Sequence, residues 1–161
     1  MKFHLMKKSG VIIFALTIGL LLSSCSKKSD STSPTGSHKI TSAKFTITVS
    51  GVDASDGDAS DFGFTTYSPT ATSATYWKIN GVAQTNQDAV GLHAAGFVSQ
   101  NTYTVELTQP VDQIDVPVTC VNNHAPFTIS YTAEINGVVV KTITNQSIAA
   151  GVNFTPTFTY P

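Results

Sequence analysis

Phe127-Thr128-Ile129-Ser130-Tyr131-Thr132-Ala133-Glu134-Ile135-Asn136-Gly137-Val138 is the stretch that decides the fold. Apolar and polar residues alternate from 127 to 135, which places them on opposite faces of one strand. The Asn136-Gly137 pair that follows is the strongest short-range indication of a β-hairpin, because a type I′ turn needs positive φ at both central positions. The stretch therefore predicts a half-buried strand that turns back on itself.

The turn also predicts the pairing of the two strands, because loop length fixes the register of a hairpin. The expected cross-strand pairs are Ile135 with Val138, Ala133 with Val140 and Tyr131 with Thr142. The polar face would then place Lys141 diagonal to Glu134. A second Asn-Gly pair in Ile79-Asn80-Gly81-Val82 predicts another hairpin, with Trp77 facing Gln84 and an exposed edge strand over 83–88.

Period-two alternation recurs through the rest of the chain and no long amphipathic helix is indicated after residue 25. One apolar face per strand is typical of antiparallel sheets with one wet side. About eight such strands predict an all-β fold, an antiparallel β-sandwich of immunoglobulin-like type, with a small β-barrel as the alternative. Pro117 and Pro156 lack the N–H that a ladder needs and are expected at edges or bulges. The other alternating runs are Phe45-Ile47-Val49, Tyr103-Val105-Leu107, Ile114-Val116-Val118-Cys120 and Phe154-Phe158-Tyr160.

Charge and cysteine content narrow the functional classes. Residues 41–161 have the length of one domain. Acidic residues outnumber basic ones in this domain, because its lysines are Lys44, Lys78 and Lys141 and the chain has no Arg. A nucleic-acid partner needs a basic surface, so nucleic acid is excluded. Cys120 closes an apolar strand face and is expected in the core, where a free thiol behaves as a small hydrophobe.

The N-terminal segment is typical of an exported protein. Lysines precede an apolar run over 11–22, which is too short for the roughly twenty residues of a membrane-spanning helix. Leu22-Ser23-Ser24-Cys25 then resembles the lipobox of bacterial lipoproteins. The resemblance implies a signal peptide over 1–24, lipidation of Cys25 and a lipid anchor in the bacterial cell envelope, with the outer membrane favoured. An ordinary signal peptide, in which the cysteine falls by chance, is the alternative.

Residues 25–40 are expected to form the lipidated Cys and a disordered tether, because only Ile40 in that segment is strongly apolar after the cysteine. A flexible chain of this length has an r.m.s. span of about 20 Å. The predicted β-sandwich domain, residues 41–161, would therefore stay close to the membrane.

The loop over 51–61 is the richest candidate site. Its clustered carboxylates suit Ca²⁺, which takes six to eight oxygen ligands. An EF-hand template that starts at Asp56 does not fit. Asp61 stands at the sixth position, where the loop needs glycine, and Tyr67 stands at the twelfth position, where it needs a bidentate Glu. A looser calcium site and a solvated loop closed by Asx-turns both remain open. The candidate metal ligands are Asp53, Asp56, Asp58 and Asp61.

Aromatic side chains supply the second candidate. Trp77 shares its parity with Ile79 and is expected in the core, whereas Tyr76 is expected on the surface. Exposed Tyr67 and Tyr76 would then be candidates for stacking on a glycan. Tyr103 belongs to an apolar face and is expected to be buried.

No catalytic motif is present in the sequence. His93 and His124 have no zinc-ligand spacing, and no nucleophile motif occurs. The sequence favours a non-enzymatic envelope lipoprotein that acts in structure or protein–protein interaction. The alternative is an accessory lipoprotein that binds a glycan or another small ligand and is stabilised by calcium.

Overall fold

The computed structural model describes residues 40–68 and 75–161. The predicted signal peptide, the predicted lipidation site Cys25 and the predicted tether up to residue 39 lie outside these residues. Within the described part of the chain, no helix has the length and apolarity needed to cross a membrane. The tether was predicted to include Ile40, but the structure corrects this boundary. The Ile40 side chain is buried, and its backbone pairs with Val111, because this one strongly apolar residue joins the core.

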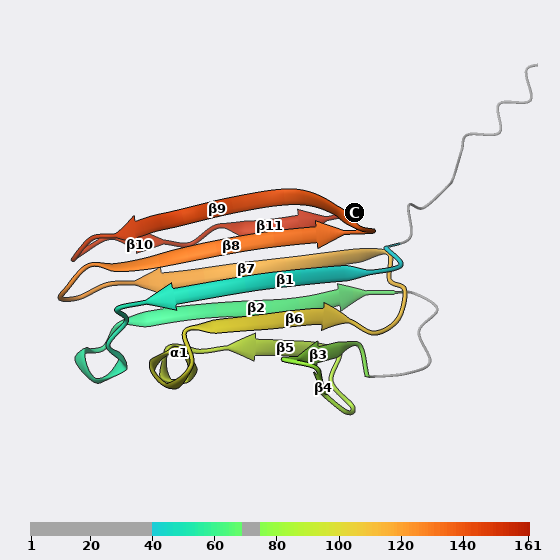
Figure 1. The fold of residues 1–161 in the computed structure, drawn as a ribbon, viewed down its shortest axis with the longest axis horizontal. Helices are drawn as coiled ribbons and strands as arrows, with labels where there is room; N and C mark the ends of the chain where they lie inside the picture. Colours follow the sequence, from blue (N-terminus) through green and yellow to red (C-terminus); the bar gives the residue numbers. More distant parts are fainter. Residues whose placement is uncertain (1–39, 69–74) are drawn as a thin grey trace, which may run out of the picture. The chain divides into compact units, whose positions relative to one another are not determined.

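The described residues form two antiparallel sheets, as Figure 1 shows. Sheet 1 has the strand order β4-β3-β6-β1-β8-β9, and sheet 2 has the order β10-β7-β2-β5, with β11 also paired to β7. The elements are β1 (Ala43–Ser50), the 3₁₀ helix η1 (Ala54–Asp56), β2 (Ala59–Tyr67), β3 (Trp77–Ile79), β4 (Val82–Ala83), β5 (Ala89–Leu92), α1 (Ala94–Ser99), β6 (Thr102–Leu107), β7 (Gln113–Val121), β8 (Phe127–Ile135), β9 (Val138–Ile148), β10 (Asn153–Phe154) and β11 (Thr157–Tyr160).

The predicted all-β antiparallel sandwich is confirmed, and the sheets do not close into the alternative barrel. The described residues contain eleven strands instead of about eight. Part of the excess arises because Pro156 divides the last expected strand into β10 and β11, as its missing N–H requires. The rest comes from β2 and β5, two strands that the sequence analysis did not predict.

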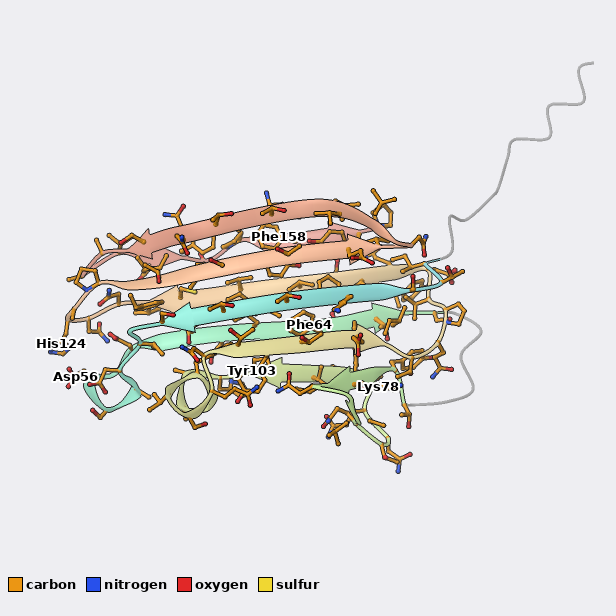
Figure 2. The ribbon with its side chains drawn as sticks, viewed as in Figure 1. Asp56, Phe64, Lys78, Tyr103, His124 and Phe158 are labelled. Atoms are coloured by element: carbon orange, nitrogen blue, oxygen red, sulfur yellow. The ribbon has the colours of Figure 1, made fainter. Side chains whose placement is uncertain are left out.

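An aromatic core joins the two sheets. Phe45 lies at its centre on β1 and is fully buried. Its ring centroid is 5.2 Å from that of Phe64, 6.3 Å from Trp77, 6.2 Å from Tyr131 and 5.7 Å from Tyr160. The hydroxyls of Tyr131 and Tyr160 share a buried hydrogen bond of 2.9 Å, so the C-terminal strand is fastened to β8 through the core. Phe64 and Phe158 are labelled in Figure 2.

Both Asn-Gly turns have the predicted type I′ conformation. Asn80 and Gly81 have φ values of 49° and 79°, and Asn136 and Gly137 have values of 50° and 78°. Ile79 pairs with Val82, as predicted, and the backbone N–H of Gln84 donates to Trp77. The predicted edge strand over 83–88 is only partly correct, because β4 ends at Ala83.

The predicted register of the second hairpin is correct next to the turn and wrong beyond it. Ile135 pairs with Val138 and Glu134 with Val139, but Ala133 then pairs with Lys141. Val140 is the extra residue of a β-bulge, which moves the side chains from Lys141 to Ile143 to the opposite face. A second register shift before Gln146 restores the predicted parity. Lys141 therefore does not lie diagonal to Glu134 on the polar face. Its Nζ sits 5.1 Å from the ring centroid of Phe158, at the open side of the sandwich.

Pro117 also corrects the sequence analysis, which placed both prolines at edges or bulges. Pro117 lies in the interior strand β7, between β2 and β11. The β2–β7 ladder has paired residues on either side of the proline and none opposite it. Gly63 occupies that place, and a Cβ there would be only 3.1 Å from Pro117 Cγ. A glycine and an interrupted ladder thus accommodate the proline inside the sheet.

The Asn side chain of each turn also binds a neighbouring strand. Asn80 Oδ1 accepts a hydrogen bond from the backbone N–H of Thr104 at 2.8 Å. Asn136 Oδ1 accepts from the backbone N–H groups of Thr41 and Ser42, at 2.8 and 3.1 Å, and from the Thr41 hydroxyl at 2.9 Å. The second turn therefore holds the segment that leads into β1.

Two substitutions of Asn136 separate the turn conformation from the hydrogen bonds to residues 41 and 42. Asn136→Gly keeps the positive φ and removes the side-chain oxygen, so we expect a loss of about 1 kcal/mol in the free energy of unfolding. Asn136→Ala also strains the turn, and we expect a loss of about 2 kcal/mol. Urea denaturation of both variants measures the difference. Wild-type stability of the glycine variant would show that these hydrogen bonds contribute nothing.

Candidate functional site

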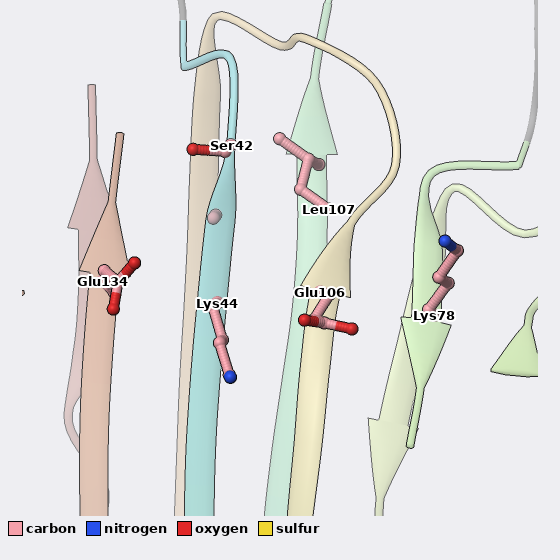
Figure 3. A pocket seen from close by; sticks show the side chains of 7 residues that line it. Ser42, Lys44, Lys78, Glu106, Leu107 and Glu134 are labelled. Carbon is pink, nitrogen blue, oxygen red and sulfur yellow. The ribbon is translucent and has the colours of Figure 1, made fainter. Parts of the chain in front are cut away.

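A row of alternating charges crosses the outer face of sheet 1 (Figure 3). Lys78 on β3 pairs with Glu106 on β6, Glu106 pairs with Lys44 on β1, and Lys44 pairs with Glu134 on β8. All four belong to the polar parity of their strands, opposite core residues such as Phe45. An open pocket of about 300 Å³ lies over the row, and its remaining lining residues are Ser42, Ala43 and Leu107.

Hydroxyl groups continue this surface along the strands. Two residues further along the strands, a row of paired threonines lies on the same face. It comprises Thr104 on β6, Thr46 on β1, Thr132 on β8 and Thr142 on β9. Two residues beyond that row, the hydroxyls of Thr48 and Thr102 are 2.9 Å apart. Together these residues give a polar face that offers hydrogen bonds and both signs of charge. Its chemistry suits recognition of a polar partner.

Two of the candidate calcium ligands, Asp53 and Asp58, have structural roles in the loop, which ends where β2 begins at Ala59. Asp53 caps η1, with its Oδ1 accepting from the Ser55 hydroxyl at 2.6 Å and from the Ser55 N–H at 2.9 Å. These hydrogen bonds lower the pKa of Asp53 below its usual range, and the bond from the Ser55 hydroxyl has the larger effect. Asp58 is buried and accepts from the backbone N–H groups of Asn123 and Asp53 at 2.9 and 3.3 Å.

The two remaining candidate ligands lie in different elements, Asp56 in η1 and Asp61 in β2. Asp56 is exposed and, like His124, lies at one end of the strands (Figure 2). Asp61 forms an exposed pair with His93, whose Nδ1 is 3.0 Å from Asp61 Oδ1. Among residues 40–68 and 75–161, no group of three or more His, Cys, Asp or Glu side chains is placed to hold a metal ion.

The aromatic candidates do not form a shared platform. Tyr67 is exposed, as expected, with 63% of its surface accessible, but Tyr76 is only 4% exposed. The prediction of an exposed Tyr76 is wrong because residue 76 precedes β3, so the alternation from Trp77 does not reach it. Tyr103 is half-buried and packs edge-on against Phe97 at 5.2 Å. A flat binding surface formed by Tyr67 and Tyr76 is therefore not present.

Cys120 lies in the core on β7, as predicted. Burial, with a smaller contribution from the charge of Asp61, raises the pKa of its thiol to about 12. The reactive thiolate is therefore scarce at neutral pH.

Slow modification of Cys120 follows from this burial. In a Cys25→Ala chain, we expect little labelling by a thiol reagent at neutral pH in the native state and rapid labelling after unfolding. A Val139→Cys variant of the same chain provides an exposed thiol for comparison, and mass spectrometry locates the label. Equal native rates at 120 and 139 would contradict the buried position.

Comparisons with known proteins identify the fold and no family. No protein-family model matches the chain, and no curated protein sequence is similar to it. A DUF4425 family protein from Bacteroides ovatus is similar in structure, with 15% identity, a TM-score of 0.50, and coverage of 75% of this chain and 94% of that chain. The calcium-bound form of a protein from Parabacteroides distasonis, solved by NMR, has 14% identity, a TM-score of 0.50, and coverage of 73% and 92%. At such identities the similarity shows the shared fold alone.

Sequence reasoning missed the row of charges on sheet 1. The parity of each strand already placed Lys44, Lys78, Glu106 and Glu134 on polar faces. Only the strand order, which brings Lys44 beside Glu134 and Glu106, makes them one surface. Alternation along a strand carries no information about which strand lies next to it.

Proposed function

We propose that this chain is a bacterial envelope lipoprotein whose β-sandwich acts as a non-enzymatic interaction module. The anchor rests on the order of charge, apolar run, small residues and cysteine that ends at Cys25. The interaction role rests on the outer face of sheet 1, which combines alternating charges with hydroxyl groups around an open pocket. Its partner is a polar envelope component, a protein or a glycan.

The anchor is tested by removing the lipidated thiol. Cys25→Ala is expected to release the protein from the membrane fraction or to leave it as an unprocessed precursor. The matched control is Cys120→Ala, which removes the other cysteine and should leave membrane attachment unchanged. Fractionation with mass measurement of the mature chain distinguishes these outcomes. A Cys25→Ala protein that matures and stays attached would refute the anchor.

The interaction role is tested by placing a photo-crosslinking residue on each outer face. A probe at Thr104 lies on the outer face of sheet 1, next to the charged row, and should crosslink to an envelope component in cells. A probe at Thr119 lies on the exposed face of β7 in sheet 2 and serves as the control. Equal crosslinking at both positions, or none at 104, would remove the support for this face.

Calcium stabilisation is a second candidate, favoured by the calcium-bound form of the structural neighbour from Parabacteroides distasonis. A ligand at a hundred times its Kd would stabilise the fold by about 2.7 kcal/mol, several degrees in Tm for a domain of this size. The carboxylates of Asp53 and Asp58 already accept protein hydrogen bonds, so we expect a much smaller shift in millimolar Ca²⁺. Thermal unfolding with Ca²⁺, with Mg²⁺ and with a chelator measures it. A shift of several degrees specific to Ca²⁺ and lost in Asp56→Ala would establish a calcium site.

A further inference from the structure

Four of the seven large exposed apolar side chains among the described residues lie at one end of the domain, while Val82, Val98 and Val152 lie elsewhere. Tyr67, Val138, Val139 and Val140 have 63%, 62%, 56% and 51% of their surfaces accessible. We call these four residues the apolar end. Tyr67 is the last residue of β2, and the three valines begin β9 directly after the Asn136-Gly137 turn. Figure 1 shows the end of β2 and the β8–β9 turn at the same end of the strands.

The described chain begins between the two parts of this apolar end. On the side of sheet 2, Ile40 pairs with Val111, and the N–H of the next residue, Asp112, donates to the Tyr67 carbonyl at 2.9 Å. On the side of sheet 1, the Asn136 side chain binds the backbone of Thr41 and Ser42, and Val138 follows that turn. The preceding segment thus joins the domain with Tyr67 on one side and the valines on the other.

We propose that the apolar end rests on the lipid surface to which the protein is anchored. This inference builds on the proposed lipidation of Cys25. The fifteen-residue separation between Cys25 and Ile40 has an expected r.m.s. span of about 20 Å, and its fully extended length is only about 50 Å. Exposed apolar patches mark membrane or protein contacts. An attached domain meets its membrane at a high effective concentration, so even a weak contact is populated.

A second copy or a partner strand fits the apolar end less well. A stable protein interface buries at least about 1,200 Å² in total, which four side chains at a strand end do not supply. Pairing of a partner strand along β9 is also impeded, because β9 carries register shifts near Val140 and again between Ile143 and Gln146. A lipid surface requires neither a large area nor a regular strand edge.

The contact would also orient the proposed interaction face. The β1 strand starts at the apolar end and runs away from it, so the strands would rise from the membrane. Val139 pairs with Glu134, so the charged row would lie next to the membrane. The threonines further along the outer face of sheet 1 would stay open to envelope components.

The test measures lipid contact at single sites in the full lipidated protein, reconstituted in phosphatidylcholine vesicles with brominated acyl chains. Val139→Cys carries an environment-sensitive fluorophore, and Val152→Cys, 45% exposed in wild type and beside β10, is the matched control. The buried Cys120 labels slowly, and an acylated Cys25 does not label. The Val139 probe should lie within ~5–10 Å of the acyl boundary and be quenched about twofold more than the Val152 probe.

Each outcome decides the proposal. Strong quenching at 139 with little at 152 supports it. Equal quenching at both positions, or none at 139 while the protein still floats with the vesicles, overturns it and leaves the anchor intact. Failure to float with the vesicles refutes the anchor and the contact together. Energy transfer between Val139 probes that rises with protein density, without bromolipid quenching, would make a second copy the occupant and overturn the lipid contact.

Discussion

Replacing Phe45 with alanine is expected to lower the free energy of unfolding by about 3–5 kcal/mol. The side chain has no accessible surface and contacts rings from both sheets, including Phe64 and Tyr131. Its removal leaves a cavity inside the aromatic cluster that joins the sheets, and a cavity that the surrounding rings fill only in part adds to the loss. A loss of this size is a large share of the 5–15 kcal/mol that stabilises a typical domain.

Urea denaturation with a constant m-value measures the loss, and the neighbouring variant Thr46→Ala is the matched control. Thr46 lies on the same strand, but its side chain belongs to the outer face, so its replacement should cost less than about 1 kcal/mol. Similar losses for the two variants would contradict a packed interface around Phe45.

Asn122→Ala is expected to destabilise the domain by about 3–4 kcal/mol, although the residue lies at the start of a loop. Its side chain is 1% exposed. Nδ2 donates to the carbonyls of Ala125 and Ile148, and Oδ1 accepts from the His124 N–H at 2.9 Å. Alanine would leave three buried or half-buried backbone groups without this partner, and each such group costs about 1–3 kcal/mol.

The adjacent Asn123 is the control for this prediction. It is exposed, and its side chain donates to the Gly57 carbonyl at 2.6 Å, where water can replace it. We expect Asn123→Ala to cost about 1 kcal/mol or less. Thermal unfolding of the two variants gives the comparison, and a smaller loss at 122 than at 123 would contradict the role assigned to the buried amide.

The fold was predictable where local chemistry decides it. Alternation over 127–135 and the two Asn-Gly pairs predicted strands and turns that the structure confirms. The errors arose where a distant partner matters. The bulge at Val140 places Lys141 over Phe158, a residue of the other sheet, and no pattern within the hairpin contains that contact. Tyr76 was misplaced because the strand begins one residue later than the alternation implied.

The candidate sites were harder to predict than the fold. The acidic loop predicted a calcium site because the sequence shows only that its carboxylates are close along the chain. The structure shows that Asp53 caps η1 and that Asp58 binds Asn123, a residue far away in sequence. The charged row was not predicted, because its members are separated in sequence and lie side by side only through the strand order of sheet 1.

The position of β1 has a mechanical consequence. The chain leading into this strand is where a pulling force from a membrane anchor would act, and β1 lies between β6 and β8 with antiparallel ladders on both sides. Its hydrogen bonds run perpendicular to the strand. A force along β1 therefore loads both ladders in shear, so that many bonds resist together instead of opening one at a time as in a peeled edge strand. The Ile40–Val111 pairing and the bonds from Asn136 to residues 41 and 42 precede β1 along the chain, so they would be loaded first and absorb the initial extension before the sheet itself is strained.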